Sequence, residues 1–376
     1  MKQIVHGVLR RTQRGMSLIE VLVAIAIGLI GILIMSQAYL TSDEFNKATL
    51  GAGGAQTNGT VALFSLEREI RMAGYGMNST SALECGSINW YYNGQYSGTL
   101  GGTLPDVELA PVLITTTPGA PDKVTIMYAT GEQRVTPATI SKTMPSPSAE
   151  LDVDGTSGFN PNDMVLMVNN TPPITCTMVQ LTTVQTSASK LQHNPGVNAP
   201  YNPAGGGSLF PAYTKNDSLF NLGNPIVRTY SVANDSLRVD EVYFAPGAAG
   251  PTGTLDLVDG IVDMRALYGK DTTAVPDGVV DVYDNVKPAT GADWMRVMSV
   301  RIAVVARVGN YEKPSGANCD ATTTAPTWTY ENPMGTPQTA TFNWTDFTDV
   351  TNQARCYRYR VFETTVPVRN IIWRYS

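Results

Sequence analysis

The chain carries at residues 16–35 the apolar run MSLIEVLVAIAIGLIGILIM, in which Glu20 is the only charged residue. Continued to Leu40, this run is long enough as a helix, about 37 Å, to cross a hydrocarbon core of about 30 Å. A carboxylate costs roughly 2.5–3.5 kcal/mol at the centre of a membrane helix, so an acidic residue there is more often functional than accidental. The run therefore predicts a membrane-length N-terminal helix in which Glu20 has a task.

The residues that precede the run carry positive charge and no acidic residue. The basic residues of this segment are Lys2, Arg10, Arg11 and Arg14. Because basic segments tend to stay on the cytoplasmic side, residues 1–15 are expected in the cytoplasm and everything after Leu40 beyond the membrane.

Two simpler interpretations of the run compete with a functional one. An ordinary secretory signal could be cleaved near Ala24-Ile25-Ala26, but the apolar run continues to Ile34, where a mature soluble protein should begin with polar residues. A plain single-pass anchor explains the length of the run but explains neither Glu20 nor the Gly15 junction.

The nine residues from Gly15 to Val23, GMSLIEVLV, closely resemble the type IV prepilin signature. The resemblance implies that a membrane peptidase cuts between Gly15 and Met16, that the new N-terminus is methylated, and that Glu20 is needed for assembly. Met16 departs from the phenylalanine usual at this position.

Cleavage at this junction would give Glu20 a partner. A new amine on Met16 lies four residues before Glu20 and therefore on the same helix face. In a bundle of subunits, the carboxylate of one chain can meet the amine of its neighbour and neutralise both in an apolar setting.

The helix is expected to extend beyond the membrane run. Residues 56–72 place their apolar side chains with largely helical spacing among charged ones, which predicts an amphipathic half-helix packed on a sheet. These apolar residues are Val61, Leu63, Phe64, Leu66, Ile70 and Met72. The intervening Gly51-Ala52-Gly53-Gly54 is either a helix end followed by a loop or a weak point within one helix, since each glycine costs about 1 kcal/mol. Gly74 and Gly76 are expected to end the helix.

From Cys85 onward the sequence changes to short β-branched or alternating runs bounded by turn residues, which predicts strands. The expected strands are 123–129, 164–168, 177–183, 226–232, 237–244, 296–308 and 357–368. In 296–308, the even-numbered residues from Met298 to Val308 share an apolar face, while Ser299, Arg301 and Arg307 mark the other.

These elements predict an α+β protein with a long N-terminal helix packed on a mostly antiparallel sheet that carries large loops. We expect four parts along the chain. They are a cytoplasmic leader (1–15), a membrane-spanning and filament-core helix (16–40), its continuation (41–76), and an exported β-rich domain with room for two sub-regions (77–376).

Four cysteines, Cys85, Cys176, Cys319 and Cys356, lie far apart without a C-x-x-C spacing, which disfavours zinc binding and thioredoxin-like chemistry. In an oxidising exported location they predict two disulfides, with three possible pairings. We favour Cys85–Cys176 and Cys319–Cys356, since nearest-neighbour pairing staples each half separately.

Later segments of the chain resemble the PilW-type minor pilins, so the resemblance covers most of the sequence. The similar segments are LEREIRMAGYG (66–76), GFNPNDMVL (158–166), CTMVQLT (176–182), VDGIVDMRALYG (258–269) and RVFETTVPVRN (360–370). Asn162 departs from the glycine usual before Asp163. Each segment is weak evidence alone, and their order behind a prepilin start makes the combination specific.

The resemblance implies a low-abundance, non-enzymatic subunit that helps initiate type IV pili, within a small complex near the tip. Its expected partners are the prepilin peptidase, other minor pilins, the major pilin, the inner-membrane assembly platform and sometimes a large tip adhesin. Twitching motility and cell adhesion would depend on such pili. The chain would reside in the bacterial inner membrane, with its C-terminal domain in the periplasm, and then in the pilus fibre.

Two alternatives remain beside this interpretation. The J-type minor pseudopilin of type II secretion shares the N-terminal start and the helix-to-sheet plan, but that family is typically much shorter. A membrane-anchored exported binding protein without a filament function would also fit the membrane run.

The residues offer little catalytic chemistry, and no cofactor is expected. His193, the one histidine after the leader, lies in a predicted loop and is far more often solvated or hydrogen-bonded than catalytic. Removing residues 1–15 leaves 22 basic against 32 acidic residues, net −10, which disfavours a broad nucleic-acid surface.

The best metal candidate is a weak one for calcium. Asp271, Asp277, Asp281 and Asp284 surround a turn at Pro276-Asp277-Gly278, and hard oxygen ligands suit this ion. The strict D-x-D-x-D-G loop is absent, because Thr273 and Val275 stand at ligand-type positions. Ordinary turns are the better interpretation.

Overall fold

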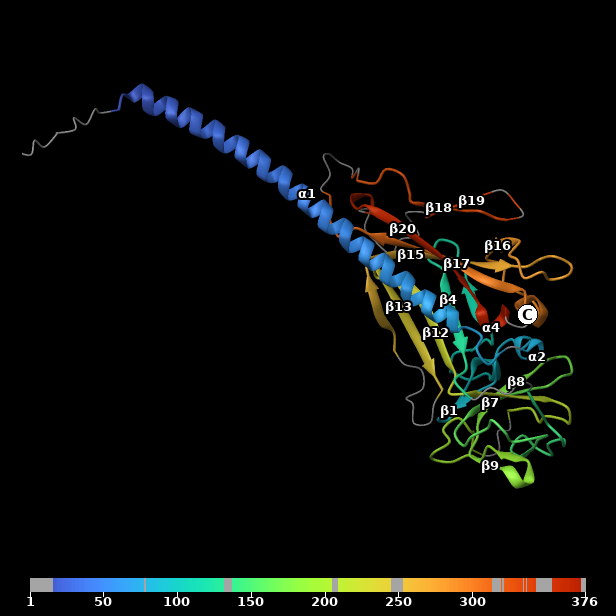
Figure 1. Cartoon of the computed structure of the whole chain (residues 1–376). Helices are drawn as coiled ribbons and strands as arrows, with labels where there is room; N and C mark the ends of the chain where they lie inside the picture. The colour runs from blue at the N-terminus through green and yellow to red at the C-terminus, as the bar shows by residue number, and fades with distance from the viewer. Residues whose placement is uncertain are drawn as a thin grey trace, which may run out of the picture. The chain divides into compact units, whose positions relative to one another are not determined.

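The computed structural model describes most of the chain after residue 15 (Figure 1). The described residues are 16–77, 79–131, 137–204, 209–244, 253–312, 319, 321–333, 335, 337–342 and 354–372. The expected leader, with Gly15, lies outside them. The chain divides into two compact units, Met1–Gly53 and Gly54–Ser376, and each is considered by itself.

One helix, α1 (Leu18–Met72), accounts for the regular structure among the described residues of the first unit and continues into the second. Residues 51–54 are helical, so the alternative of a helix end and loop at these glycines is not what forms. A Cβ added at Gly53 or Gly54 would meet no atom within 4 Å, and the glycines thus leave their stretch of helix without side-chain support.

In the second unit, α1 buries a narrow stripe of small and branched residues. Ala55, Ala62, Leu66 and Ile70 are at most 1% exposed and recur at helical spacing. The predicted apolar face is only partly right, because Val61, Phe64 and Met72 are between 46% and 64% exposed. The stripe that faces the sheet is narrow because Gly59 and the two alanines let the helix approach closely.

Two antiparallel sheets form the core against which this part of α1 packs (Figure 1). The first has the order β14-β13-β12-β4-β3, with bounds Leu255–Asp259, Ser236–Tyr243, Ile226–Ala233, Lys123–Tyr128 and Val112–Thr115. The second has the order β16-β15-β17-β20, with bounds Val282–Asp284, Ile261–Lys270, Val297–Arg307 and Tyr359–Pro367.

A second group of strands lies around a smaller hydrophobic core. It comprises the sheet β5-β11-β7-β8 (Ala138–Thr139, Ser218–Gly223, Met164–Val168, Cys176–Gln180) and the sheet β6-β10-β9 (Leu151–Asp152, Lys190–Gln192, Thr183–Gln185). Strand β7 is buried on both faces: Met164, Leu166 and Val168 belong to the large core, and Val165 and Met167 to the small one. Alternate side chains of one strand therefore join the two cores.

The remaining short elements connect or cover these sheets. They are the helices α2 (Thr80–Leu83), α3 (Gly291–Trp294) and α4 (Arg369–Ile372), the 3-10 turns η1 (Gly98–Leu100), η2 (Thr186–Ala188) and η3 (Ala354–Cys356), and the hairpins β1–β2 (Tyr91–Tyr92, Gln95–Tyr96) and β18–β19 (Thr327–Tyr330, Gln338–Thr341).

The hairpin β18–β19 covers the face of strand β17 that its polar residues mark in the sequence. Ser299, Ala303 and Val305 point away from the apolar face that the alternation predicts, yet they are at most 6% exposed. Trp328 and Phe342, from the hairpin and the residue that follows it, pack on this second face of β17 and bury it. A polar stripe on a strand is a weak sign of exposure when a later segment folds over it.

The α+β class is confirmed, with an apolar N-terminal helix followed by a mostly antiparallel β domain. Six of the expected strands, now β4, β7, β12, β13, β17 and β20, begin and end within two residues of their predicted bounds. Strand β15 was not among the expected strands, because burial of both its faces removes the alternation on which the prediction depends.

Candidate assembly site on the N-terminal helix

The start of α1 is a capped helix end that includes the acidic residue. Ser17 stands immediately before the helix, and its backbone N–H donates a 3.1 Å hydrogen bond to Oε2 of Glu20. The carbonyl of Ser17 accepts the first helical hydrogen bond, from the N–H of Val21. This is one half of a capping box, in which an acidic residue at the third helical position satisfies the N–H of the cap residue.

The helix that follows is uncovered. Residues 18–43 are long and apolar enough to cross a membrane, and none of this span is buried within the structure. Met16, Leu18 and Ile19 are 70–82% exposed. An apolar surface of this extent must be shielded from water by lipid or by neighbouring subunits.

In the second unit the outer face of α1 also leaves apolar side chains open. Val61, Phe64 and Met72 follow one another at helical spacing, and Arg68 lies among them with its side chain 71% exposed. This surface is available to another protein, whereas the opposite face belongs to the core of the chain itself.

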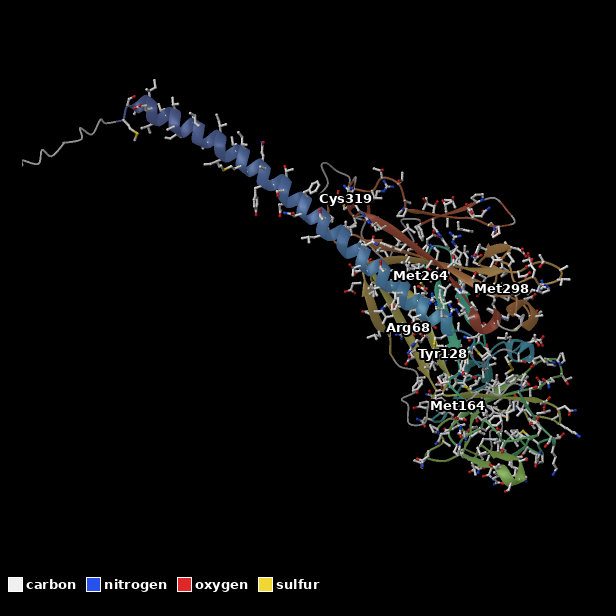
Figure 2. The ribbon with its side chains drawn as sticks, viewed as in Figure 1. Arg68, Tyr128, Met164, Met264, Met298 and Cys319 are labelled. Atoms are coloured by element: carbon white, nitrogen blue, oxygen red, sulfur yellow. A yellow bond between two sulfur atoms is a disulfide. The ribbon has the colours of Figure 1, made fainter. Side chains whose placement is uncertain are left out.

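A buried polar network holds α1 on its sheet, and Figure 2 labels one of its members, Tyr128. Glu69 on α1 is 4% exposed, and its Oε2 accepts a 2.8 Å hydrogen bond from Nη1 of Arg228 on β12. The hydroxyl of Tyr128 on β4 donates to the same oxygen at 3.3 Å, and Arg228 Nε also pairs with Glu241 on β13. Burial, followed by the charge of Glu69, raises the pKa of Tyr128, so its hydroxyl keeps its proton.

The end of α1 is fixed by residues from distant parts of the chain. Asn370 on α4 donates through Nδ2 to the carbonyl oxygens of Met72 and Ala73, at 3.1 and 3.0 Å. The next residue, Gly74, has φ of +74° and donates its N–H to the carbonyl of Met127. A left-handed glycine thus turns the chain at the helix end, as expected.

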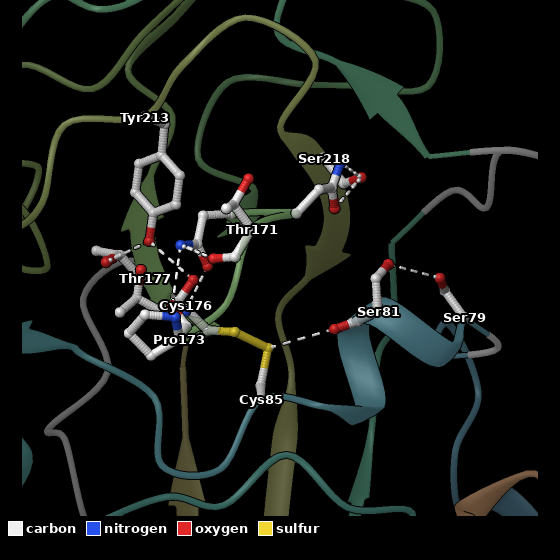
Figure 3. The surroundings of a disulfide bond; sticks show 12 residues. Ser79, Ser81, Cys85, Thr171, Pro173, Cys176, Thr177, Tyr213 and Ser218 are labelled. Carbon is white, nitrogen blue, oxygen red and sulfur yellow. Dashed lines mark hydrogen bonds between the residues drawn. A yellow bond between two sulfur atoms is a disulfide. The ribbon is translucent and has the colours of Figure 1, made fainter. Parts of the chain in front are cut away.

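Both expected disulfide bonds are present. Figure 3 shows the first of them, between Cys85 and Cys176. Cys85 is joined to Cys176, and Cys319 to Cys356, which is the nearest-neighbour pattern. The first bond ties the segment after α2 to the start of β8. Beside this disulfide the two segments also pair through their backbones. The N–H of Asn89 donates to the carbonyl of Cys176, and the N–H of Met178 donates to the carbonyl of Asn89, both at 2.9 Å.

The aspartates proposed for calcium serve a turn. Asp271 accepts hydrogen bonds from the N–H groups of Thr273, Asp277 and Gly278, and Asp281 accepts from those of Thr272 and Thr273. Burial acts to raise the pKa of Asp271, but these hydrogen bonds outweigh it and hold the pKa below its usual value. Among the described residues, no group of three or more metal-binding side chains converges.

His193 is 7% exposed, and its Nε2 donates to the carbonyl of Ala149 at 3.0 Å. Burial lowers the pKa of its imidazole, and the hydrogen bond to Ala149 opposes this in part. A neutral, hydrogen-bonded imidazole in the small core is a structural group.

Comparisons with known protein families match two parts of the chain. Residues 226–370 match the family of the type IV pilus-assembly protein W, and residues 10–36 match the prokaryotic N-terminal methylation motif. The matches support a PilW-type pilin with a prepilin-like signature. No curated protein and no solved structure matches the chain.

The two matches fall on the elements just described. The methylation motif spans Glu20 and the uncovered start of α1, and the PilW region spans β12 to α4, which includes Arg228 and Asn370, two residues that hold α1. The matches indicate a structural component of the pilus, and the apolar N-terminal segment supports anchoring to the membrane.

Sequence reasoning missed the pair of Glu69 and Arg228. The only signal was a charged residue on each of two elements that otherwise bury apolar side chains, and neither residue indicates its partner. The two residues are 159 positions apart in the sequence, and only the folding of the sheet brings them together.

Proposed function

We propose that this PilW-type pilin is a minor pilin that takes part in the initiation of type IV pili, in a complex with other minor pilins. The observation that carries the proposal is α1. It carries a prepilin-like motif and a long apolar surface that stays uncovered among the described residues, while its later turns are locked to a folded domain.

The proposed orientation follows from charge. Residues 1–15 would lie in the cytoplasm, the apolar helix would cross the inner membrane, and the domain from residue 77 would lie in the periplasm before assembly. The two disulfides support an oxidising location for the domain.

The proposed chemistry of assembly is charge pairing. After cleavage between Gly15 and Met16, the ammonium of Met16 would approach the Glu20 carboxylate of a neighbouring subunit. The Ser17 N–H occupies only part of the acceptor capacity of that carboxylate, which has about four lone-pair sites, so it can accept a second donor. In an apolar bundle, this pairing would offset the cost of both buried charges.

The outer face of α1 in the folded domain gives the proposed complex a second contact. The stripe of Val61, Phe64 and Met72 could pack on the corresponding helix of another pilin, beside the exposed Arg68, which pairs within the chain with Glu69 at 3.3 Å. Other minor pilins, the major pilin and the inner-membrane platform are the proposed partners.

The test begins with the mature protein. Intact-mass analysis of the chain from cells with an active prepilin peptidase should find Met16 at the N-terminus. Deletion of the gene should abolish surface pili, with recovery on complementation, and immunogold labelling should find the chain on sheared filaments. Loss of protein secretion with normal pili would favour a pseudopilin instead, and a mature chain that keeps residues 1–15 would rule out both.

A further inference from the structure

Beyond pilus assembly, the domain contains a pocket that neither family match explains. It lies between the hairpin β18–β19, strand β16 and the loop at residues 116–122, on the face of the second sheet that the hairpin covers. Its volume is about 700 Å³. Sites for small molecules commonly measure about 300–1,000 Å³, so the pocket has room for a small ligand.

The pocket is lined in part by the buried carboxylate of Asp122, one oxygen of which makes no hydrogen bond among the described residues. Asp122 is 3% exposed, and its Oδ2 accepts a 3.0 Å hydrogen bond from the N–H of Ala266. Its Oδ1 makes no hydrogen bond among the described residues, and the Nη1 atom of Arg265 lies 3.6 Å away. Buried oxygens without a donor are rare in folded proteins and call for an explanation.

The electrostatics of Asp122 agree with this geometry. Burial raises the pKa of its carboxyl group, and the Ala266 N–H, Arg265 and Thr116 offset only part of the rise. Thr116 is exposed and lines the pocket.

The walls of the pocket combine aromatic rings with side-chain amides. Tyr283, Trp328 and Tyr330 supply the rings, and Asn285, Asn332 and Gln338 supply the amides. Aromatic faces pack against apolar C–H surfaces, and an amide offers both a donor and an acceptor to a hydroxyl group. Such walls suit a ligand that carries both kinds of surface.

The charges around the pocket are already paired within the protein. Asp284 takes a 2.6 Å hydrogen bond from Lys270, Asp122 lies beside Arg265, and Arg301 pairs with Glu363 at 3.0 Å. The guanidinium of Arg301 also lies 5.6–6.0 Å from the centroids of the Tyr283, Trp328 and Tyr330 rings. Of the charged residues that line the pocket, a cationic ligand would meet Arg265, and an anionic one would meet Asp122 and Asp284.

We propose that this pocket binds a neutral carbohydrate. The sugar ring packs its C–H face on Tyr330 and Tyr283, its hydroxyls bond to the amides of Asn285 and Gln338, and one hydroxyl donates to Asp122. This hydroxyl would supply the hydrogen bond that Oδ1 of Asp122 lacks among the described residues.

The experiment uses the full chain, purified in a detergent without a sugar head group. Calorimetry and saturation-transfer NMR are run with lactose, cellobiose and N,N′-diacetylchitobiose, and with spermidine and glucose 6-phosphate as charged comparators. At least one disaccharide should bind with a Kd of ~1 mM or tighter, and each comparator at least ~10-fold more weakly.

Matched variants locate the binding. Tyr330→Ala should weaken it at least ~10-fold, whereas Tyr311→Ala, which removes a tyrosine outside the pocket, should leave it unchanged. Asn285→Ala, at the rim, should weaken binding with no change in melting temperature, which separates lost contacts from lost folding. Absence of saccharide binding at ~10 mM, equal binding by the two tyrosine variants, or tighter binding of a charged comparator would each overturn the proposal. Purified protein is used throughout, so the result is independent of pilus assembly.

Discussion

The backbone N–H of Ser17 donates to Oε2 of Glu20 across 3.1 Å, so the carboxylate expected to act in assembly also caps the helix on which it lies. The two roles are compatible, because a carboxylate has acceptor sites to spare and an acidic group at a helix N-terminus is favoured by the helix dipole. They are also separable, because capping needs only an acceptor, whereas pairing with an ammonium needs the negative charge.

Substitution of Glu20 distinguishes these roles. Glu20→Gln keeps an acceptor for Ser17 but loses the charge, and Glu20→Ala loses both. If charge pairing drives assembly, both variants should lower incorporation into sheared pili at least ~10-fold, because each leaves a neighbour's amine unpaired in an apolar setting. Quantitative immunoblots of pilus and membrane fractions measure this, with membrane levels as the control. Near-normal incorporation of Glu20→Gln would assign the residue to capping alone.

Gly59 sets how closely α1 approaches β20. A Cβ at this position would lie 2.2–2.8 Å from three ring atoms of Phe362, which is too close for any side chain. Gly59→Ala should therefore destabilise the fold by about 1–3 kcal/mol despite the better helix propensity of alanine. Thermal melting followed by circular dichroism checks this.

Gly54→Ala is the matched control for that substitution. It adds the same methyl group to the same helix, where no atom lies within 4 Å, so it should be neutral or stabilise by up to about 1 kcal/mol. Equal effects of the two substitutions would mean that the contact with Phe362 adjusts at little cost.

Removal of one member of the Glu69–Arg228 pair should lower the free energy of unfolding more than removal of both. Arg228→Met removes the cation that lies 2.8 Å from the buried Glu69 carboxylate and leaves it only the exposed Arg68, at 3.3 Å, which should cost up to about 3–5 kcal/mol. The double variant Glu69→Leu with Arg228→Met should recover much of that loss, because the buried carboxylate of Glu69 is removed as well. A double-mutant cycle from denaturant unfolding measures the coupling, and simple additivity would contradict it.

His193 should make the domain sensitive to acid. Its folded-state pKa lies below the unfolded value of about 6.5, so the folded state binds fewer protons. The stability due to this group is present above that pH and is lost as the pH falls through 6.5 toward the folded pKa. His193→Gln should flatten this part of the profile of melting temperature against pH, while the rest of the profile is retained. An unchanged slope would assign the acid sensitivity to other groups.

The disulfides can be tested by connectivity and by removal. Non-reducing peptide mapping should recover Cys85 with Cys176 and Cys319 with Cys356, and a peptide joining Cys176 to Cys319 would contradict the structure. Replacing Cys85 and Cys176 by serine should destabilise the domain by about 2–5 kcal/mol, since this bond closes the longer loop, with a sequence separation of 91 against 37. Denaturant unfolding compares the stability of this double variant with that of the variant in which Cys319 and Cys356 are replaced by serine.

Local patterns were sufficient for much of the fold. The twenty-residue run that contains Glu20 and is otherwise almost entirely apolar predicts the helix, and the alternating runs predict strands such as β12 and β13 within a residue or two. The turn at Asp271–Gly278 was also expected from its Pro-Asp-Gly sequence. These features depend on residues close together in the chain.

Distant contacts decided the rest. Whether Arg228 reaches Glu69, whether Trp328 covers Ala303, and whether Phe362 lies against Gly59 depend on which segments the sheets bring together. The pocket that holds Asp122 likewise forms only where a loop, a strand and a hairpin meet. The sequence by itself determined the membrane helix, the strands and the processing motif, because hydrophobic period and charge act over a few residues. Only the tertiary structure decided which side chains are paired or buried, because burial is a property of the neighbours that folding supplies.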